Sequence, residues 1–541
     1  MRVPVVRSRS ITVAVLVAML TLVVAPMAYA GPKSVGHEVR LQILAINDFH
    51  GQIEPYKSSS GAISGGAALM AGYMDAREDA AKLTNTDTWR LGVGDLVGAS
   101  PAVSGLLQDE PTMQVLDEMD FMYSVVGNHE FDEGLAELYR LQYGGFSAVT
   151  GEWDGTRMDY LAANVVDEVT GEPIFPPYVI ERNRGVPIGI IGVVYEGTPT
   201  IVTASGVAGL EFLPEAATVN KYVAELKGKG VETIIVLLHN GGSGTTSGGT
   251  ISGDFVPVVA AMDDEVDVVF SGHSHNRYWG YIGSKLVTSA YSAGRAFADV
   301  DLVIDRKSGD VISKSAEIVN VLPNAGFEPN IDVAAIVQAA LDRVAPIVNE
   351  VVGTAASDLS RTQNAGGESR LGNLVADAQR WKQGTQIAVC NPGGIRTDLA
   401  AGEVTFGELF AIQPFSNYLV TMTMTGAQID TMLEQQWVGQ GTSIKMLQLS
   451  GMRYSWSASA PVGSRVDPAS VFVGGAPLDL SATYTVTANN FLAEGGDNFV
   501  VFRDALNKTY FGVDLDALVE YVKQLPQPFD SLIEGRANVL P

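Results

Sequence analysis

Cysteine, basic residues and long apolar segments are all scarce in this chain of 541 residues. Cys390 is the single cysteine, so the chain cannot form an internal disulfide bond. Lys and Arg total 35 against 61 Asp and Glu, which gives a formal charge of −26. Such a surface repels nucleic-acid backbones and anionic membranes. We therefore expect no nucleic-acid polymer among the partners, and any phosphorylated substrate needs a local centre of positive charge.

The N-terminal region holds the one long apolar run, which is short for a membrane span. Three arginines, the apolar run and a small-x-small signature follow one another there: Arg2, Arg7, Arg9, Ile11–Ala25 and Ala28–Ala30. This order is typical of a secretory signal peptide, here residues 1–30, and an uncleaved anchor helix is the alternative. No cysteine stands at the cleavage site to carry a lipid. We expect an exported protein, in the periplasm, the cell wall or the medium, without stable membrane insertion.

The chain is too long for one hydrophobic core, and its composition, 46% hydrophobic and 18% charged, is that of a globular protein. Buried strands recur with helical patterns between them, which predicts a layered α/β fold. An apolar stripe at helical spacing runs from residue 331 to 351 and follows a loop that contains Pro323 and Pro329. We therefore predict a first domain at 31–330, a linker helix at 331–351 and a second domain at 352–541. The oligomeric state is left open.

Polar side chains follow buried strands at five places in the first three hundred residues. The apolar run Met122–Val126 leads into Gly127-Asn128-His129-Glu130-Phe131-Asp132. In open α/β sheets ligands bind where the strands end. The other four turns supply Asp48 and His50, Asp95, His239, and His273 with His275. Of the six histidines only His37 lies outside these turns, which scattered structural histidines would not produce.

These turns offer seven nitrogen and oxygen ligands without a thiolate, enough for two cations: Asp48, His50, Asp95, Asn128, His239, His273 and His275. Imidazole and carboxylate suit zinc, manganese or a similar divalent metal. Two such cations would leave a local excess of positive charge, with Asp95 as the best bridge between them. That excess could bind a phosphate and lower the pKa of a bound water toward about 7. His129 could then protonate the leaving group, with Asp132 orienting its ring.

In order along the chain, Asn47–Gly51, Gly94-Asp95, Gly127–Asp132, His239–Gly242 and Gly272–His275 resemble the calcineurin-like metallophosphatases. Three later motifs, Asn391–Arg396, Gln413–Phe415 and Asn490–Asp497, narrow the resemblance to the secreted 5′-nucleotidase and UDP-sugar hydrolase family. The resemblance covers nearly all of the chain after the signal peptide. Pro392 stands where that family often has glycine, which stiffens the turn.

The resemblance implies a four-layer αββα metallophosphatase sandwich followed by a smaller α/β domain that binds the nucleoside. It implies one cation on Asp48, His50, Asp95 and His275, and a second on Asp95, Asn128, His239 and His273. His129 and Asp132 match a catalytic dyad. Substrate contacts are expected from Arg370, Asn391, Arg396, Phe415, Asn417, Phe491 and Asp497, where the two phenylalanines enclose the base and Arg396 contacts phosphate. Arg361 is a further candidate for a phosphate contact.

The resulting prediction is an exported phosphoric-ester hydrolase that uses two divalent cations to release phosphate from nucleoside 5′-phosphates, with UDP-sugars left open as further substrates. A 2′,3′-cyclic-nucleotide phosphodiesterase would use the same chemistry. A non-catalytic exported nucleoside-binding protein is the alternative from another class, but a binder has no need of His129 or of a full set of metal ligands. A surface interaction protein that kept the scaffold would show degenerate ligands, and none are seen.

Overall fold

In a computed structural model of the protein, residues 37–57, 61–441 and 443–540 are described. The predicted signal peptide, residues 1–30, lies outside the described residues. Within the described ranges no helix combines the length and the apolar character needed to cross a membrane.

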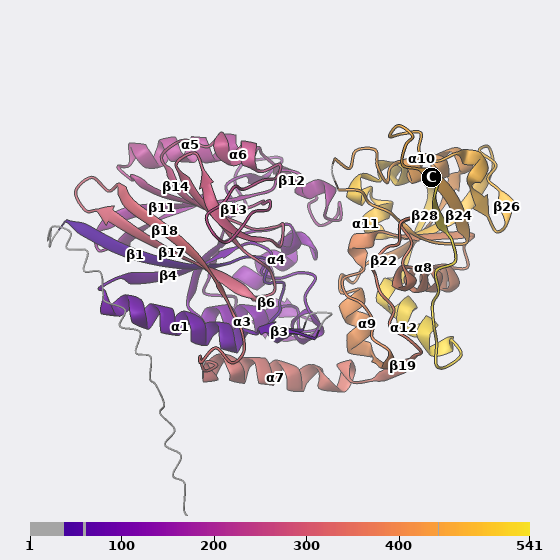
Figure 1. Cartoon of the computed structure of the whole chain (residues 1–541), viewed down its shortest axis with the longest axis horizontal. Coiled ribbons are helices and arrows are strands. Elements are labelled where there is room, and N and C mark those ends of the chain that lie inside the picture. Colours follow the sequence, from indigo (N-terminus) through magenta and orange to yellow (C-terminus); the bar gives the residue numbers. More distant parts are fainter. Residues whose placement is uncertain (1–36, 58–60, 442, 541) are drawn as a thin grey trace, which may run out of the picture. The chain divides into compact units, whose positions relative to one another are not determined.

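Two six-stranded sheets form the first half of the described chain (Figure 1). The first sheet has the order β18 (Val311–Asn320), β17 (Ala296–Asp305), β1 (Glu38–Ile46), β4 (Asp87–Val93), β5 (Phe121–Val125) and β8 (Asp159–Leu161). The second has the order β10 (Tyr178–Asn183), β11 (Val186–Val194), β13 (Thr233–His239), β14 (Val266–Ser271), β16 (Lys285–Ala290) and β15 (Arg277–Ile282). The strands that end at the predicted ligand turns include three parallel pairs: β1 with β4, β4 with β5, and β13 with β14.

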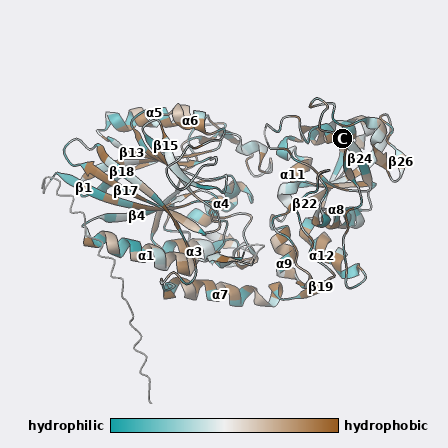
Figure 2. Ribbon diagram, viewed as in Figure 1, coloured by the Kyte–Doolittle hydropathy of each residue, from teal (hydrophilic) through white to brown (hydrophobic). Residues whose placement is uncertain are grey.

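Helices cover both outer faces of the paired sheets, which confirms the predicted αββα sandwich. Helices α1 (Ala67–Leu83) and α3 (Glu110–Glu118) pack over the first sheet, and α7 (Ile331–Val348) packs against these two helices. Helices α5 (Glu215–Gly228) and α6 (Val256–Ala260) pack over the second sheet. Strand β1 is buried on both faces: Ile43 meets the second sheet, whereas Leu44 and Ile46 meet the layer of α1. Strand β1 begins with the exposed Glu38 and Arg40 and is buried from Leu41 to Ile46, and Figure 2 shows hydrophilic and hydrophobic residues mixed along the strands.

A second α/β layer structure follows in the C-terminal half. Its main sheet has the order β23 (Gln448–Ser450), β20 (Ile387–Cys390), β27 (Thr483–Asn489), β22 (Tyr418–Thr425) and β28 (Leu506–Val513). Its helices are α8 (Arg370–Gln383), α9 (Phe406–Ile412), α10 (Gly426–Glu434), α11 (Asn490–Ala493) and α12 (Asp514–Gln524). A smaller sheet contains β26 (Ala476–Pro477), β25 (Phe472–Val473), β24 (Met452–Ser457) and β29 (Ala537–Leu540). The overall class is therefore the predicted mixed α/β fold.

Helix α7 occupies the predicted linker segment but ends at Val348, three residues earlier than expected. Strand β19 (Val351–Ala355) begins at Val351, where the helix was expected to end. Its buried side chains include Val333 and Val344, which belong to the predicted stripe. They pack into the core shared with α1 and α3, so this helix is attached to the first half. The domain boundary near residue 330 stays a prediction.

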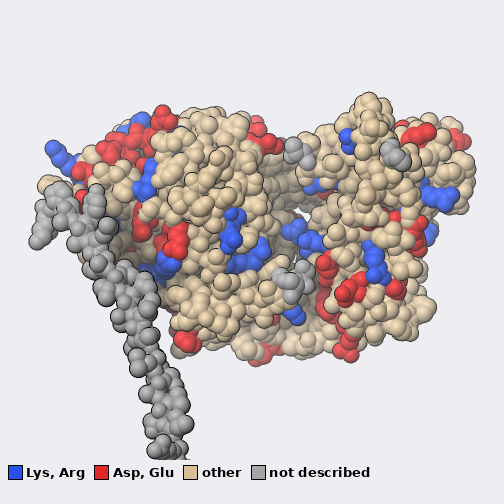
Figure 3. Space-filling view, in the orientation of Figure 1, with Lys and Arg blue, Asp and Glu red and all other residues tan. Residues whose placement is uncertain are grey.

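Figure 3 shows acidic side chains gathered over α5 and near α12 on the face in view.

A buried carboxyl group at the start of α12 is expected to make stability depend on pH. Asp514 is 3% exposed, and it accepts hydrogen bonds from the Leu515 N–H at 2.8 Å and from Gln413 Nε2 at 3.1 Å. Burial raises the pKa of Asp514 to about 8. The unfolded chain ionises this group near pH 4. Between those values the native state holds the extra proton, so the free energy of unfolding falls as the pH rises toward about 8.

Asp514→Asn removes this ionisation and should flatten the part of the stability profile that lies between about pH 4 and pH 8. Gln413 Oε1 has no hydrogen-bond partner in the described part of the chain and can accept from the new amide. At pH 8–9 the variant should melt a few degrees above the wild-type protein, and near pH 4, where both forms of the chain hold the Asp514 proton, the two should melt together. Thermal unfolding across this pH range tests the prediction, and two parallel profiles would contradict it.

Candidate metal centre and substrate pocket

The loops after β1 and β4 continue to pair beyond the ends of their strands. The Asp48 N–H donates to Gly94 O at 3.1 Å, and the His50 N–H donates to Asp95 O at 2.9 Å. These three polar residues have left-handed backbones, with φ of 51° at Asp48, 50° at His50 and 50° at Asp95. Such conformations cost on the order of 1 kcal/mol each for non-glycine residues and collect at functional sites. The hydrogen bonds between the loops hold them in place.

The structure brings the predicted ligands together in two groups that share one carboxylate. In each group the ligand atoms all lie within 4.8 Å of one another. The first group is Asp48, His50, Asp95 and His275, and the second is Asp95, His239 and His273. Asn128 adjoins the second group, because its Oδ1 lies 2.9 Å from His273 Nδ1.

The hydrogen bonds of two histidines leave ring nitrogens that face other electron-pair donors. His239 Nδ1 lies 2.7 Å from Val93 O, so this nitrogen carries a proton. In the neutral ring, its Nε2 then presents a lone pair 3.1 Å from Asp95 Oδ2. His50 donates in the same way to Gly98 O at 2.9 Å, which leaves its Nε2 facing His275 Nε2 at 3.0 Å. Facing lone pairs repel unless a proton or cation lies between them, so the donor set fits divalent cations.

Burial and charge set the protonation of these groups. Burial lowers the pKa of His50 to about 3 and that of His273 to about 4, so both are neutral, the form in which imidazole binds metals. Burial opposes a charge on Asp95, but His239 and His129 hold the pKa of its carboxyl well below the usual value. Burial alone would also lower the pKa of His239, but Asp95 raises it to about 10. A proton and a cation therefore compete for the same His239 nitrogen.

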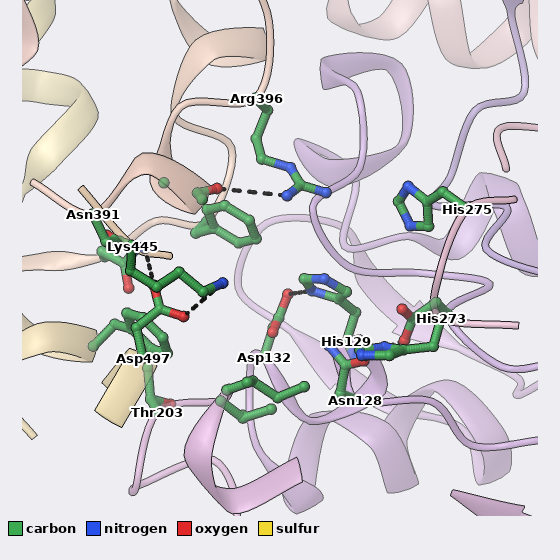
Figure 4. Close-up of a pocket in the computed structure, with 18 residues that line it drawn as sticks. Asn128, His129, Asp132, Thr203, His273, His275, Asn391, Arg396, Lys445 and Asp497 are labelled. Carbon is green, nitrogen blue, oxygen red and sulfur yellow. Dashed lines mark hydrogen bonds and ion pairs between the residues drawn. The ribbon is translucent and has the colours of Figure 1, made fainter. Parts of the chain in front are cut away.

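His129 and Asp132 lie together on one short turn, η1 (His129–Phe131), directly after β5. His129 Nδ1 is 2.7 Å from Asp132 Oδ2. Burial would lower the pKa of His129, but the carboxylates of Asp132 and Asp95 raise it above the usual value. The turn thus holds an imidazole that favours its protonated form. Figure 4 shows this pair between the candidate ligands His273 and His275 on one side and Asn391 and Asp497 on the other.

A cavity of about 280 Å³ joins the ligand groups to residues of the second half. From the first half it is lined by Asp95, Asn128, His129, Asp132, Ile201, Val202, Thr203, His273 and His275. From the second half it is lined by Asn391, Gly393, Gly394, Arg396, Phe415, Asn417, Lys445, Phe491 and Asp497. Six of the seven predicted substrate residues therefore meet the dyad and part of both ligand groups in one cavity.

Arg370 is the seventh predicted substrate residue, and the structure does not bring it to the cavity. It begins α8, and its guanidinium donates to Ser531 O at 2.7 Å and to Asp358 O at 3.0 Å. It also pairs with Asp530 at 2.5 Å, so these contacts attach the helix to the C-terminal segment. Burial lowers the pKa of Arg396, and the nearby charge of Arg361 lowers it further. Arg361 donates a hydrogen bond to Ile395 O at 3.0 Å.

Aromatic and polar contacts fill the far side of the cavity. The Phe415 ring lies 5.8 Å from the His129 ring at an interplanar angle of 15°, and Arg396 Cζ lies 5.4 Å from the Phe415 centroid. Asp497 is contacted at 3.3 Å both by Asn391 Nδ2 and by Lys445 Nζ. The sequence interpretation missed Lys445, which stands in no recognisable motif, and the loop of residues 201–203.

Comparisons with known proteins agree with this arrangement. Residues 41–277 match the calcineurin-like phosphoesterase family, and residues 351–504 match the 5′-nucleotidase C-terminal domain. A cell wall protein of Listeria monocytogenes is 36% identical over 94% of this chain and 70% of its own length. An endonuclease of Bacillus subtilis is 36% identical over 93% of this chain, which spans 41% of that relative. The crystal structure of a 5′-nucleotidase precursor from Thermus thermophilus superimposes with a TM-score of 0.76 at 28% identity, covering 93% of this chain and 99% of that one. The chain therefore belongs to the 5′-nucleotidase family, phosphoric-ester hydrolases in which a calcineurin-like phosphoesterase domain precedes a 5′-nucleotidase C-terminal domain.

Proposed function

We propose that this protein releases phosphate from nucleoside 5′-phosphates with the help of two divalent cations. The observation that carries the proposal is the shared cavity: the two ligand groups and His129 line one side, and aromatic, amide and carboxylate side chains line the other. This arrangement suits a ligand with a phosphate at one end and a flat, hydrogen-bonding group at the other.

Zinc, manganese or similar cations bound by the two groups would supply a water of lowered pKa and positive charge for the phosphoryl oxygens. Asp95 belongs to both groups and would hold the two sites at a fixed spacing. His50 and His273 are neutral at pH 7 and can ligate without losing a proton first. Asp48 and Asp95 provide two negative charges, which leaves the occupied centre positive enough to attract a phosphate in an acidic protein.

His129 is assigned as the general acid. Asp132 accepts a hydrogen bond from its Nδ1, which leaves Nε2–H of the imidazolium to protonate the 5′ oxygen as the ester bond breaks. Arg396 lines the same cavity, and a guanidinium there can contact two phosphate oxygens at once. The chain itself thus provides proton transfer and one fixed positive charge.

The nucleoside is assigned to the second half of the cavity. Phe415 and Phe491 offer ring faces for the base, and Asn391, Asn417 and Asp497 offer hydrogen bonds to the sugar and the base. Hydrolysis of UDP-sugars and of 2′,3′-cyclic nucleotides would use the same residues. Phosphate release or product formation measured on a panel of these substrates and of nucleoside 5′-phosphates distinguishes the three activities. We do not extend the endonuclease activity named for one relative to this chain, because the chain spans only 41% of that relative.

Export is also part of the proposal. The predicted signal peptide supports it, as does the relative named a cell wall protein, of which this chain spans 70%.

Replacing both Phe415 and Phe491 by alanine tests the assignment of the nucleoside site. Base stacking contributes about 1–3 kcal/mol per base, so kcat/KM for nucleoside monophosphates should fall by about 10- to 100-fold. A small chromogenic phosphate has no base, and its kcat/KM should change little.

Phe491→Ala alone is the matched control, because Phe415 also contacts the His129 ring and its loss could disturb the dyad. In the single variant too, kcat/KM for nucleoside monophosphates should fall more than kcat/KM for the chromogenic phosphate. Equal losses on both kinds of substrate would argue against base stacking.

A further inference from the structure

Glu130 joins the two loops that carry the shared carboxylate and the catalytic turn, and no role described so far uses it. Its side chain is 4% exposed. One carboxylate oxygen accepts the N–H groups of Asp95 at 2.9 Å and of Gly127 at 2.5 Å. The other accepts the N–H of Leu96 at 2.8 Å and the Tyr160 hydroxyl at 3.4 Å.

These donors lie just past the ends of two neighbouring strands. Strands β4 and β5 run parallel and pair through Val93 and Val125. Beyond those residues the ladder stops, and backbone N–H groups in a buried place need other acceptors. The Glu130 carboxylate satisfies three of them at once and so closes the gap between the two loops. The loops also approach closely, since a Cβ on Gly127 would lie 2.2 Å from Asp95 Oδ1.

Asp95 is fixed through its backbone on one side and its carboxylate on the other. Glu130 holds the N–H of Asp95 in the left-handed conformation that the residue adopts. Asp95 Oδ1 accepts the His129 N–H at 2.8 Å, which leaves Oδ2 directed at His239. Because Glu130 and His129 are adjacent on one turn, a shift of the Glu130 carboxylate would move both the shared ligand and the general acid.

We propose that Glu130 is a positioning residue of the metal centre: it sets the orientation of the Asp95 carboxylate that both cation sites share, without touching substrate. The inference rests on the proposed function, because it assumes that the two ligand groups bind cations. A carboxylate is required there. The two carboxylate oxygens accept from four donors. In a glutamine one of these oxygens is replaced by an NH₂ group, which cannot accept, so at least one of the four donors would lose its acceptor.

A second buried carboxylate in the chain offers a matched control. Glu368 is 3% exposed and accepts the N–H groups of Glu534 at 2.7 Å, Gly535 at 2.9 Å and Arg536 at 3.0 Å. Asn373 Nδ2 is its fourth donor at 2.7 Å. It therefore has the same number of backbone donors as Glu130, but it lies in the second half and contacts no candidate metal ligand.

The experiment compares Glu130→Gln with Glu368→Gln after removal of metal by a chelator. Manganese is titrated into each folded protein and followed by calorimetry and by electron paramagnetic resonance. Glu130→Gln should weaken manganese binding by about 10- to 100-fold, as expected when a partner that orients a ligand is lost. Glu368→Gln should lower the melting temperature while its manganese affinity stays within about twofold of the wild-type value.

Wild-type affinity in Glu130→Gln, or an equal loss in both variants, would overturn the inference. If Glu130→Gln does not fold, Glu130→Asp replaces it, because aspartate keeps the carboxylate but is shorter by one methylene group. The manganese affinity of Glu130→Asp should also fall about tenfold or more, and an unchanged affinity would overturn the inference. The manganese titration also separates this inference from the proposed function. A wild-type protein that binds two manganese ions but leaves nucleotides intact contradicts the proposed substrate, whereas the role of Glu130 is still decided by the affinities.

Discussion

Replacing His129 by alanine is expected to lower kcat for nucleoside monophosphates by about 10²- to 10⁴-fold while the bound metal content stays unchanged. His129 belongs to neither ligand group of the described chain, although it lies beside both. Its Nδ1 is engaged by Asp132 at 2.7 Å, and Asp132 and Asp95 raise its pKa above the usual value against the effect of burial. Its loss should therefore remove a proton donor and leave the cation sites intact.

The leaving group distinguishes a general acid from a residue that only supports the fold. A nucleoside 5′ oxygen is a poor leaving group and needs a proton, whereas a nitrophenolate leaves without one. His129→Ala should therefore lose much more activity on nucleotides than on nitrophenyl phosphate. His275→Ala, which removes a ligand of the first group, is the matched histidine control and should lose metal and both activities together. A His129→Ala enzyme within about threefold of wild-type kcat on nucleotides would refute the assignment.

The sequence allowed the ligand turns to be predicted because each is local. A buried strand followed at once by a histidine or aspartate is visible within ten residues. The apolar run Met122–Val126 corresponds to β5, which begins and ends one residue earlier. Parallel neighbours bring such turns to one edge of a sheet. The choice between a four-layer sandwich and another α/β fold came from the family resemblance, since periodicity alone does not fix the order of strands.

The parts that were not predicted depend on contacts between distant residues. Strand β17 pairs with β1 across more than two hundred residues, and β18 mixes polar and apolar residues at the sheet edge without a regular alternation. Arg370 was expected to contact substrate, but two of the residues that its guanidinium contacts instead, Asp530 and Ser531, lie 160 and 161 residues away. The donors to Glu130 are backbone N–H groups, which side-chain patterns do not reveal.

Asp95 offers the sharpest test of whether the two cation sites are coupled. Asp95→Asn keeps the size of the side chain and an oxygen to accept the His129 N–H, but it removes the charge and one of the two oxygen ligands. Because Asp95 belongs to both ligand groups, the variant should lose both cations, and phosphate release should fall to background. Asp48→Asn makes the same chemical change in a residue that belongs to the first group alone, so it should lose one cation and keep the other.

Metal analysis of the dialysed proteins, with phosphate release measured on the same samples, distinguishes the outcomes. Two cations per chain in the wild-type protein, about one in Asp48→Asn and none in Asp95→Asn would support a shared carboxylate. Chelator treatment of the wild-type protein should abolish activity, and added manganese or zinc should restore it, which shows that the metal and not the fold was lost. About one cation in each of the two variants would mean that Asp95 serves a single site.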